Sequence, residues 1–361
     1  MGTTSSFFGG GGGSPLPQPE WLLGKSNYTY TFPYDGVVLV HVIGAGGSGA
    51  AQYQIYSATG GGAGGYSRKQ FTVTSSTTAT VTTGVGGAAR GQGSTSQSGL
   101  AGTASTFVLS STTLTANGGG GGNHNGNASN KGTGGTASGG DVNYTGGNSG
   151  ARGGDYNNYG QATGGGAVNF FNLTTDGGSI TNGGRVCATG GGGVGGRGGD
   201  IGNNGTYQIT GGGGSGGAAD DIPNNSNSGY AQAGGGVAGN RLFLFTGPFL
   251  DGKGGNPIRL ANYSVEPNLS PFETIGIGAG SGGMAAIEEN ADTPQMIAQN
   301  AGIFGGGGGC YASKHKGSKG GDGGLGGGGG GHSYHSSTSN PQRTSGKGGD
   351  GVVIIEYIER S

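Results

Sequence analysis

The sequence is dominated by glycine runs with a period of three residues. Within 192–200 the pattern Gly-Gly-x occurs three times, with Val194, Arg197 and Asp200 at the third position. This period matches a left-handed helix of the polyproline-II type, which has three residues per turn and no internal hydrogen bonds. Neither an α-helix nor a β-strand has it. We therefore expect polyglycine-II helices that hydrogen-bond to one another through their backbones and form a bundle.

The composition argues against a disordered chain. Glycine accounts for 99 of the 361 residues, but proline is scarce at 11 and aromatic residues make up 8%. Disordered chains are usually richer in proline and charge and poorer in aromatics. Collagen does not fit either, because Gly-x-y is not sustained. The net charge of −1, without a basic run, does not favour nucleic acid or an anionic membrane as a partner.

Other sequence signals limit the compartment and the chemistry. No apolar stretch approaches the ~18 residues of a membrane span, so we expect no membrane insertion. Residues 1–13 lack the basic region and apolar core of a signal peptide, which does not favour secretion by the ordinary route. Cys187 and Cys310 lack metal-ligand spacing and are either free thiols or a single disulfide.

Runs of β-branched and aromatic residues predict an all-β fold with almost no α-helix. The expected strands are Tyr28–Phe32, Val37–Ile43, Tyr66–Thr74, Thr78–Thr82, Ser105–Leu109, a short one at Leu114, and Val352–Ile358. We expect 28–116 and 350–361 to form a β-sandwich base into which a glycine lattice, 117–349, is inserted. Residues 1–27 are expected to be an attachment arm that docks through Phe7, Phe8, Trp21 and Leu22.

Counting glycine runs as crossings of the lattice predicts which segments lie far from the base. Fourteen runs give an even number of crossings, so the chain returns in time for Val352. By the same count, the apolar segment 241–277 returns to the base. The far segments are Ala50–Thr59, Asn123–Lys131, Asp155–Thr163, Arg185–Thr189, Ala218–Ala233, Met284–Phe304 and His332–Ser345. Thr293, Pro294 and Gly302 suggest a short helix in one of them.

The far segments are rich in tyrosine, histidine, asparagine and serine. Tyrosine gives a large contact area at low entropic cost, and asparagine and serine give adaptable hydrogen bonds, as in antibody paratopes. We therefore expect a binding surface there. Its candidate residues are Tyr53, Tyr56, His124, Tyr156, Tyr159, Tyr230, His332, Tyr334 and His335.

Motifs for catalysis, cofactors and metals are weak. Gly44–Gly49 follows a strand and matches the dinucleotide pattern G-x-G-x-x-G, but no acidic residue occurs between Asp35 and Asp141 to bind a ribose. Gly195–Asn203 nearly matches a calcium-binding nonapeptide, yet Gly202 stands where a large apolar residue is needed. We expect no enzymatic activity, no cofactor and no metal site.

Three stretches resemble a known family. They are FPYDGVVLVHVIGAGGSGA, GGGAGGYSRKQFTVTSSTTATVTTGVGG and GGDGVVIIEY. In this order they are similar to the glycine-rich domain of bacteriophage tail fibres and tail-tip adhesins. The resemblance implies a polyglycine-II sandwich in a virion protein whose distal loops bind a bacterial surface receptor, a glycan or an outer-membrane protein. It also implies other tail or fibre proteins as partners, with a homotrimer as a further option.

Two other functions stay open. One is a purely structural virion fibre or decoration protein. The other is an extracellular ice-binding or matrix protein, because polyglycine bundles also resemble some antifreeze proteins. An ice-binding protein requires a regular threonine or alanine face, and the third positions Val194, Arg197 and Asp200 are mixed.

Overall fold

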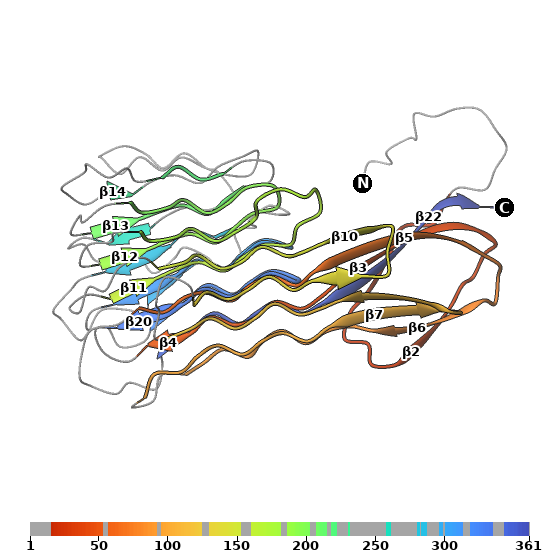
Figure 1. Ribbon diagram of the computed structural model, residues 1–361, viewed down its shortest axis with the longest axis horizontal. Coiled ribbons are helices and arrows are strands. Elements are labelled where there is room, and N and C mark those ends of the chain that lie inside the picture. Colours follow the sequence, from red (N-terminus) through yellow and green to blue (C-terminus); the bar gives the residue numbers. More distant parts are fainter. Residues whose placement is uncertain are drawn as a thin grey trace, which may run out of the picture.

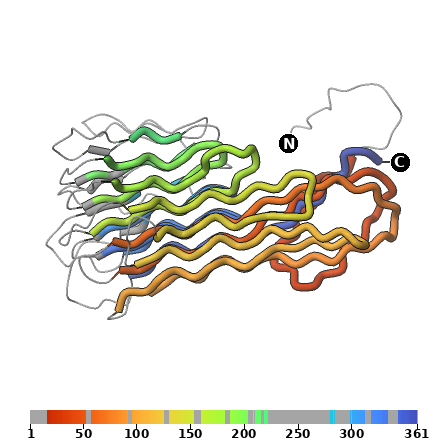
Figure 2. Tube along the Cα trace, in the orientation of Figure 1, coloured from red at the N-terminus to blue at the C-terminus, as the bar shows by residue number. Residues whose placement is uncertain are grey.

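The protein is all-β, and the described part of the chain contains no helix (Figure 1). The computed structural model describes residues 16–52, 57–91, 95–124, 130–152, 160–181, 186–202, 207–214, 218–221, 230–231, 258–260, 280–281, 283–286, 296–298, 300–312, 318–334 and 343–360. A β-sandwich stands at one end of an elongated molecule. Glycine-rich segments run side by side from it to the other end, here called the distal end (Figure 2).

Two antiparallel sheets form the sandwich. The first has the order β1 (Glu20–Leu22), β22 (Val352–Arg360), β3 (Gly36–Ile43), β5 (Tyr66–Val73) and β10 (Val142–Tyr144). The second has the order β2 (Tyr28–Thr31), β6 (Thr78–Thr82), β7 (Ser105–Leu109), β8 (Thr112–Ala116) and β9 (Ala137–Ser138). The strands predicted from the N-terminal region and the C-terminus are all present, and β22 lies between β1 and β3 as the closing strand.

Alternating side chains create the core between the two sheets. Val38, Val40 and Val42 of β3 are fully buried, and the residues between them are only partly buried, which is the period of two expected of a strand. Phe107 and Ile355 face the same core from β7 and β22. The sandwich therefore contains the large apolar side chains that the glycine-rich segments lack.

Beyond the sandwich, backbone hydrogen bonds repeat every three residues. Gly44, Gly47 and Ala50 donate their N–H groups to segment 59–65; Ala45, Ser48 and Ala51 donate to 97–103; Gly46 and Gly49 donate to 346–349. Three neighbours that recur every three residues are what a helix of three residues per turn implies. We call these segments rods.

Two predicted crossings are in fact pairs of rods. In Gly190–Gly199 the chain reverses at Val194 and Gly195, and Gly193 and Gly196 exchange two backbone hydrogen bonds of 2.7 and 3.1 Å. In Gly320–Gly331 it reverses at Leu325 and Gly326. Gly195 and Gly326 have φ of +79° and +70°, which glycine adopts without steric conflict. The number of crossings was therefore undercounted, and the inferred direction of later rods was wrong.

Short parallel strands join the rods at the distal end (Figure 1). One sheet has the order β11 (Gly160–Ala162), β12 (Val186–Ala188), β13 (Tyr207–Ile209) and β14 (Tyr230–Ala231). A second has β15 (Ile258–Leu260), β16 (Met284–Ala286), β18 (Cys310–Ala312), β20 (His332–Tyr334) and β4 (Ala51–Gln52), and a third has β17 (Met296–Ile297), β19 (Ser318–Lys319) and β21 (Arg343–Thr344). We call a rod outward if the chain runs from the sandwich to the distal end and inward if it runs the other way. Each distal sheet joins rods of one direction only, so its strands pair in parallel.

Four predictions about segments were wrong. Ile258–Leu260, the described part of 241–277, pairs with β16 at the distal end instead of returning to the base. Residues 296–297 form β17 where a short helix was expected. Phe304, predicted to be far from the base, packs with Tyr66 and Val352 beside the sandwich. The base also draws β9 and β10 from the predicted lattice.

The predicted attachment arm is partly built into the sandwich. Residues 20–22 pair with β22 as strand β1. Leu22 is 3% exposed in the sandwich core, so its burial there explains its apolar character and its predicted role in attachment was wrong. Trp21, on the opposite side of the strand, is 44% exposed. Phe7 and Phe8 lie outside the described residues.

The distal end as a candidate binding site

At the distal end, a residue that ends an outward rod is followed in the sequence by a residue that begins an inward rod. Gln52 of β4 and Ser57 are such a pair of residues, and Tyr334 of β20 and Arg343 of β21 are another. The segments between them connect an outward rod to an inward one. Their ends are fixed by the parallel sheets, so residues far apart in sequence are brought to one end of the molecule.

A ladder of threonines lies directly beneath these sheets. Thr163, Thr189 and Thr210 follow β11, β12 and β13, and all three are buried. The hydroxyl of Thr163 donates to the carbonyl of Gly150 at 2.9 Å, and that of Thr210 donates to Gly199 at 2.6 Å. Each hydroxyl also accepts an N–H from the neighbouring inward rod, as Thr163 does from Gly60. The ladder thus joins outward and inward rods where the lattice ends.

The sequence signal for this ladder is a short repeat that sequence reasoning missed. Ala-Thr-Gly-Gly-Gly stands at 58–62, 162–166 and 188–192, and Ile-Thr-Gly-Gly-Gly stands at 209–213. Each copy is the start of one inward rod. The repeat therefore marks positions at which a strand passes into a rod.

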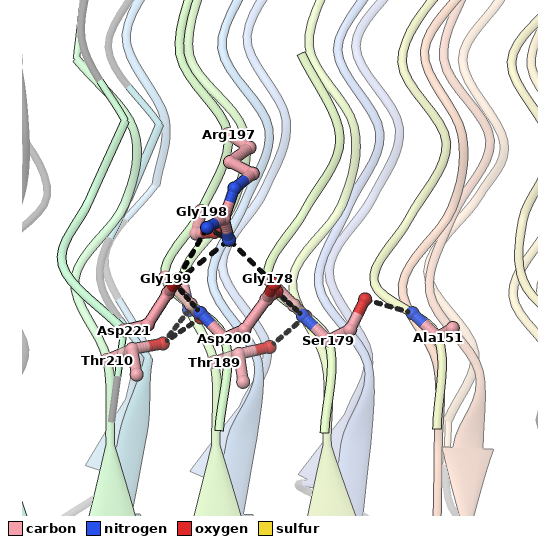
Figure 3. A network of polar contacts seen from close by, with 11 residues as sticks. Ala151, Gly178, Ser179, Thr189, Arg197, Gly198, Gly199, Asp200, Thr210 and Asp221 are labelled. Atoms are coloured by element: carbon pink, nitrogen blue, oxygen red, sulfur yellow. Dashed lines mark hydrogen bonds and ion pairs between the residues drawn. The ribbon is translucent and has the colours of Figure 1, made fainter. Parts of the chain in front are cut away.

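Hydroxyl and carboxylate side chains of the outward rods replace backbone acceptors at the lattice surface (Figure 3). The N–H of Ala151 donates to the hydroxyl of Ser179 at 3.0 Å, the N–H of Ser179 to Asp200 at 2.7 Å, and the N–H of Asp200 to Asp221 at 2.8 Å. Each side chain comes from the next rod in the row. Short polar side chains therefore hold the rods in register without adding bulk between them.

Arg197 links two of these carboxylates. Its guanidinium contacts Asp200 at 2.6 Å and binds both oxygens of Asp221, at 2.9 and 2.5 Å. Donating hydrogen bonds to the carboxylate of Asp221 raises the pKa of Arg197. Burial raises the pKa of Asp200 and outweighs both the N–H of Ser179 and the charge of Arg197. The group has one guanidinium for two carboxylates, so Arg197 holds two neighbouring rods together through Asp200 and Asp221.

Arg197 and Asp200 belong to a second repeat. A basic residue, two glycines and an aspartate occur at 152–155, 197–200, 319–322 and 347–350, and the basic residue and the aspartate form an ion pair in the last three. In a helix with three residues per turn, positions i and i+3 lie on the same face. The repeat therefore gives an ion pair on one side of a rod, and it could have been recognised in the sequence from the three-residue period.

The structure describes only part of the predicted binding surface. His124 lies at the distal end and its Nδ1 hydrogen-bonds with the hydroxyl of Ser98 at 2.9 Å. The backbones of Tyr230 and Tyr334 lie in β14 and β20. The remaining candidates fall outside the described residues: Tyr53, Tyr56, Tyr156, Tyr159 and His335.

His332 was wrongly predicted to face a receptor. It is fully buried in β20, and its Nε2 hydrogen-bonds with the hydroxyl of Ser318 at 2.6 Å. Burial, together with the charge of Arg343, lowers the pKa of His332 to about 3, so the imidazole is neutral. Its side chain is part of the interior between the second and third distal sheets.

Other groups at the distal end are also interior. Cys187 and Cys310 are both buried and form no disulfide, and burial raises the pKa of Cys310 to about 12. Among the described residues there is no cluster of three or more histidine, cysteine and acidic side chains that could hold a metal ion. The described residues likewise include no helix long and apolar enough to cross a bilayer.

A family described as a glycine-rich domain matches residues 23–256, which include most strands of the sandwich and the first part of the lattice. No curated protein matches the chain.

Proposed function

The chain belongs to the glycine-rich domain family, and from this premise we propose that it is a receptor-binding protein of a bacteriophage tail fibre or tail tip. In this proposal the sandwich side attaches to other tail or fibre proteins of the virion, and the distal end binds a glycan or outer-membrane protein on the bacterial surface. The protein is extracellular as part of the virion, without catalytic activity of its own.

The observation that carries the proposal is the separation of the two ends. Strand β1 and the C-terminal strand β22 belong to the sandwich, whereas β14 with Tyr230 and β20 with Tyr334 belong to the distal end (Figure 1). A protein with a sandwich at one end and tyrosine-bearing segments at the other suits an adhesin.

The lattice supports binding because it holds those segments on rigid supports. Interior rods such as 44–51 donate successive N–H groups to three different neighbours, so such a rod cannot move without breaking bonds to several others. Segments whose ends are already fixed lose less conformational entropy on binding, which improves affinity. Several copies on one virion would add avidity.

Binding of the labelled full-length chain to a panel of bacterial strains tests the proposal. The distal variant replaces 125–129 and 335–340 with glycine-serine segments of the same length. The control is Val85→Ser, at a side chain that is 64% exposed on the rod next to the sandwich. We expect the wild type and the control to bind a subset of strains and the distal variant to lose binding.

Pretreating the cells separates the two receptor classes. Periodate removes binding if the receptor is a glycan, and protease removes it if the receptor is an outer-membrane protein. Binding of the distal variant at the wild-type level contradicts the distal assignment. Absence of binding to every strain favours a purely structural role in the virion.

A further inference from the structure

An exposed apolar patch lies where the lattice meets the sandwich. Trp21 stacks on Phe304 with ring centroids 5.9 Å apart, Phe304 meets Phe170 edge-on at 4.9 Å, and Phe170 contacts Phe171 at 6.3 Å. With their sequence neighbours these rings make what we call the junction patch: Trp21, Phe170, Phe171, Leu173, Ile303 and Phe304. It combines β1 with two turns at the inner ends of rods.

Much of this patch faces water. Phe171 is 67% exposed, Leu173 is 50% exposed and Trp21 is 44% exposed. Single exposed apolar residues are ordinary, but a contiguous group of them marks an interaction surface. None of the six residues is charged or forms an ion pair, so the surface suits an uncharged apolar partner.

Phe304 occupies a turn position whose backbone conformation glycine adopts more easily. Three inner turns have the same hydrogen bond, from the fourth residue to the first, at 193–196, 302–305 and 324–327. Their third residues all have positive φ, and two are Gly195 and Gly326, whereas the third is Phe304 at +70°. A bulky residue is an outlier in this conformation. The strained turn retains the ring on which Trp21 stacks.

The N-terminal segment has the chemistry and the length to cover this patch. Residues 1–15, which lie outside the described part, contain Met1, Phe7 and Phe8 and no charged residue. The described chain begins at Leu16, five residues before Trp21. The eight residues from Phe8 to Leu16 span up to about 28 Å, which is enough to fold back onto the patch. Five consecutive glycines follow Phe8 and impose little restriction on the direction of the chain.

We propose that Phe7 and Phe8 dock on the junction patch of their own chain. A short tether gives an effective concentration of about 1 mM, so docking within one chain prevails over docking between chains in micromolar solutions. Phe7 and Phe8 then serve as an intramolecular cover of the surface that Trp21 and Phe171 expose.

Trp21 is the only tryptophan of the chain, so its fluorescence reports on the patch directly. The experiment compares the full-length wild type with Phe7→Ser/Phe8→Ser, and uses Ser5→Ala/Ser6→Ala in the same segment as the control. We expect the phenylalanine variant to shift the emission to longer wavelength and to raise the acrylamide quenching constant about twofold, because the indole loses its apolar cover. The control should match the wild type.

Changes on the patch side complete a double-mutant cycle. Phe171→Ser, at a side chain that is mostly exposed, should also raise the quenching of Trp21, and combining it with Phe7→Ser/Phe8→Ser should add little further. Additive effects would mean that the two groups act separately and would overturn the proposal. So would equal quenching in the wild type and Phe7→Ser/Phe8→Ser.

Dilution distinguishes docking of Phe7 and Phe8 on the patch of their own chain from covering of the patch by a second copy. If the emission of the wild type depends on protein concentration and light scattering finds a dimer, a second copy covers the patch and the proposal fails. A folded state for each variant is established beforehand from its denaturation midpoint.

Discussion

A single methyl group in the lattice gives the sharpest test of its packing. Gly165 lies in an inward rod, where its N–H donates to Gly307 at 2.8 Å and its carbonyl accepts from Gly192 at 2.9 Å. A Cβ atom at this position would approach the backbone carbonyl of Gly328 to less than 3.0 Å, a separation that real Cβ atoms essentially never show. Because the obstacle is backbone and not a flexible side chain, Gly165→Ala must push two rods apart.

The size of the effect follows from the bonds between those two rods. Gly328 donates to Gly166 at 2.9 Å and Gly331 donates to Thr163 at 3.0 Å, and both bonds lengthen if the rods separate. Each weakened hydrogen bond costs about 0.5–1.5 kcal/mol. Overpacking of a close-packed interior adds about 1–3 kcal/mol. We therefore expect Gly165→Ala to lower the free energy of unfolding by about 2–6 kcal/mol.

Gly91→Ala is the matched control, because an added Cβ there meets no atom within 4 Å and φ is not positive. Alanine at such a site reduces the entropy of the unfolded chain and stabilises the protein by up to about 1 kcal/mol. Guanidinium titration and calorimetry of the wild type and both variants measure the difference. Equal midpoints for Gly165→Ala and the wild type would refute the close packing of the rods.

Three further predictions concern single side chains. His332 is neutral in the folded protein, because its pKa is lowered from 6.5 to about 3. Its contribution to the free energy of unfolding is therefore complete above pH 6.5 and falls by up to about 5 kcal/mol as the pH drops toward 3. His332→Gln should make the free energy of unfolding depend less on pH in denaturation series from pH 7 to 4. Thr189→Val removes a buried hydroxyl with two partners and should lower the free energy of unfolding by about 2 kcal/mol, while exposed Thr80→Val should leave the denaturation midpoint nearly unchanged. Leu22→Ala should destabilise by about 2–5 kcal/mol, whereas Leu23→Ala, at an exposed neighbour, should change the midpoint little.

The sandwich was the part most easily predicted. Thr78–Thr82 and Ser105–Leu109 were placed to the residue, because alternating β-branched and aromatic side chains report burial directly. Trp21 and Leu22 were assigned to the arm, since a strand of three residues has too little pattern to be recognised. Its pairing with β22 depends on the edge that the rest of the sheet leaves open.

The backbone hydrogen bonds of the lattice repeat every three residues, as the glycine pattern does, but the path of the rods was not predicted. A turn at Val194 and Gly195 looks like any other Gly-Gly-x unit, so the sequence contains no mark of the reversal there. The burial of His332 was missed for a related reason. Histidine in a polar segment resembles a surface residue until Ser318 and Arg343 from two other strands enclose it.

Sequence alone determined the two kinds of segment in this protein. These are apolar strands that form a sandwich, and three-residue glycine repeats that cannot form a core of side chains. Tertiary structure decided where each rod turns, which rods become neighbours and which polar groups are enclosed. The physical reason is that glycine has no side chain with which to encode a partner. The identity of each neighbour is therefore set by the few side chains between the rods, such as Thr189, Asp200 and Phe304, and by the sandwich that fixes where the first rods begin.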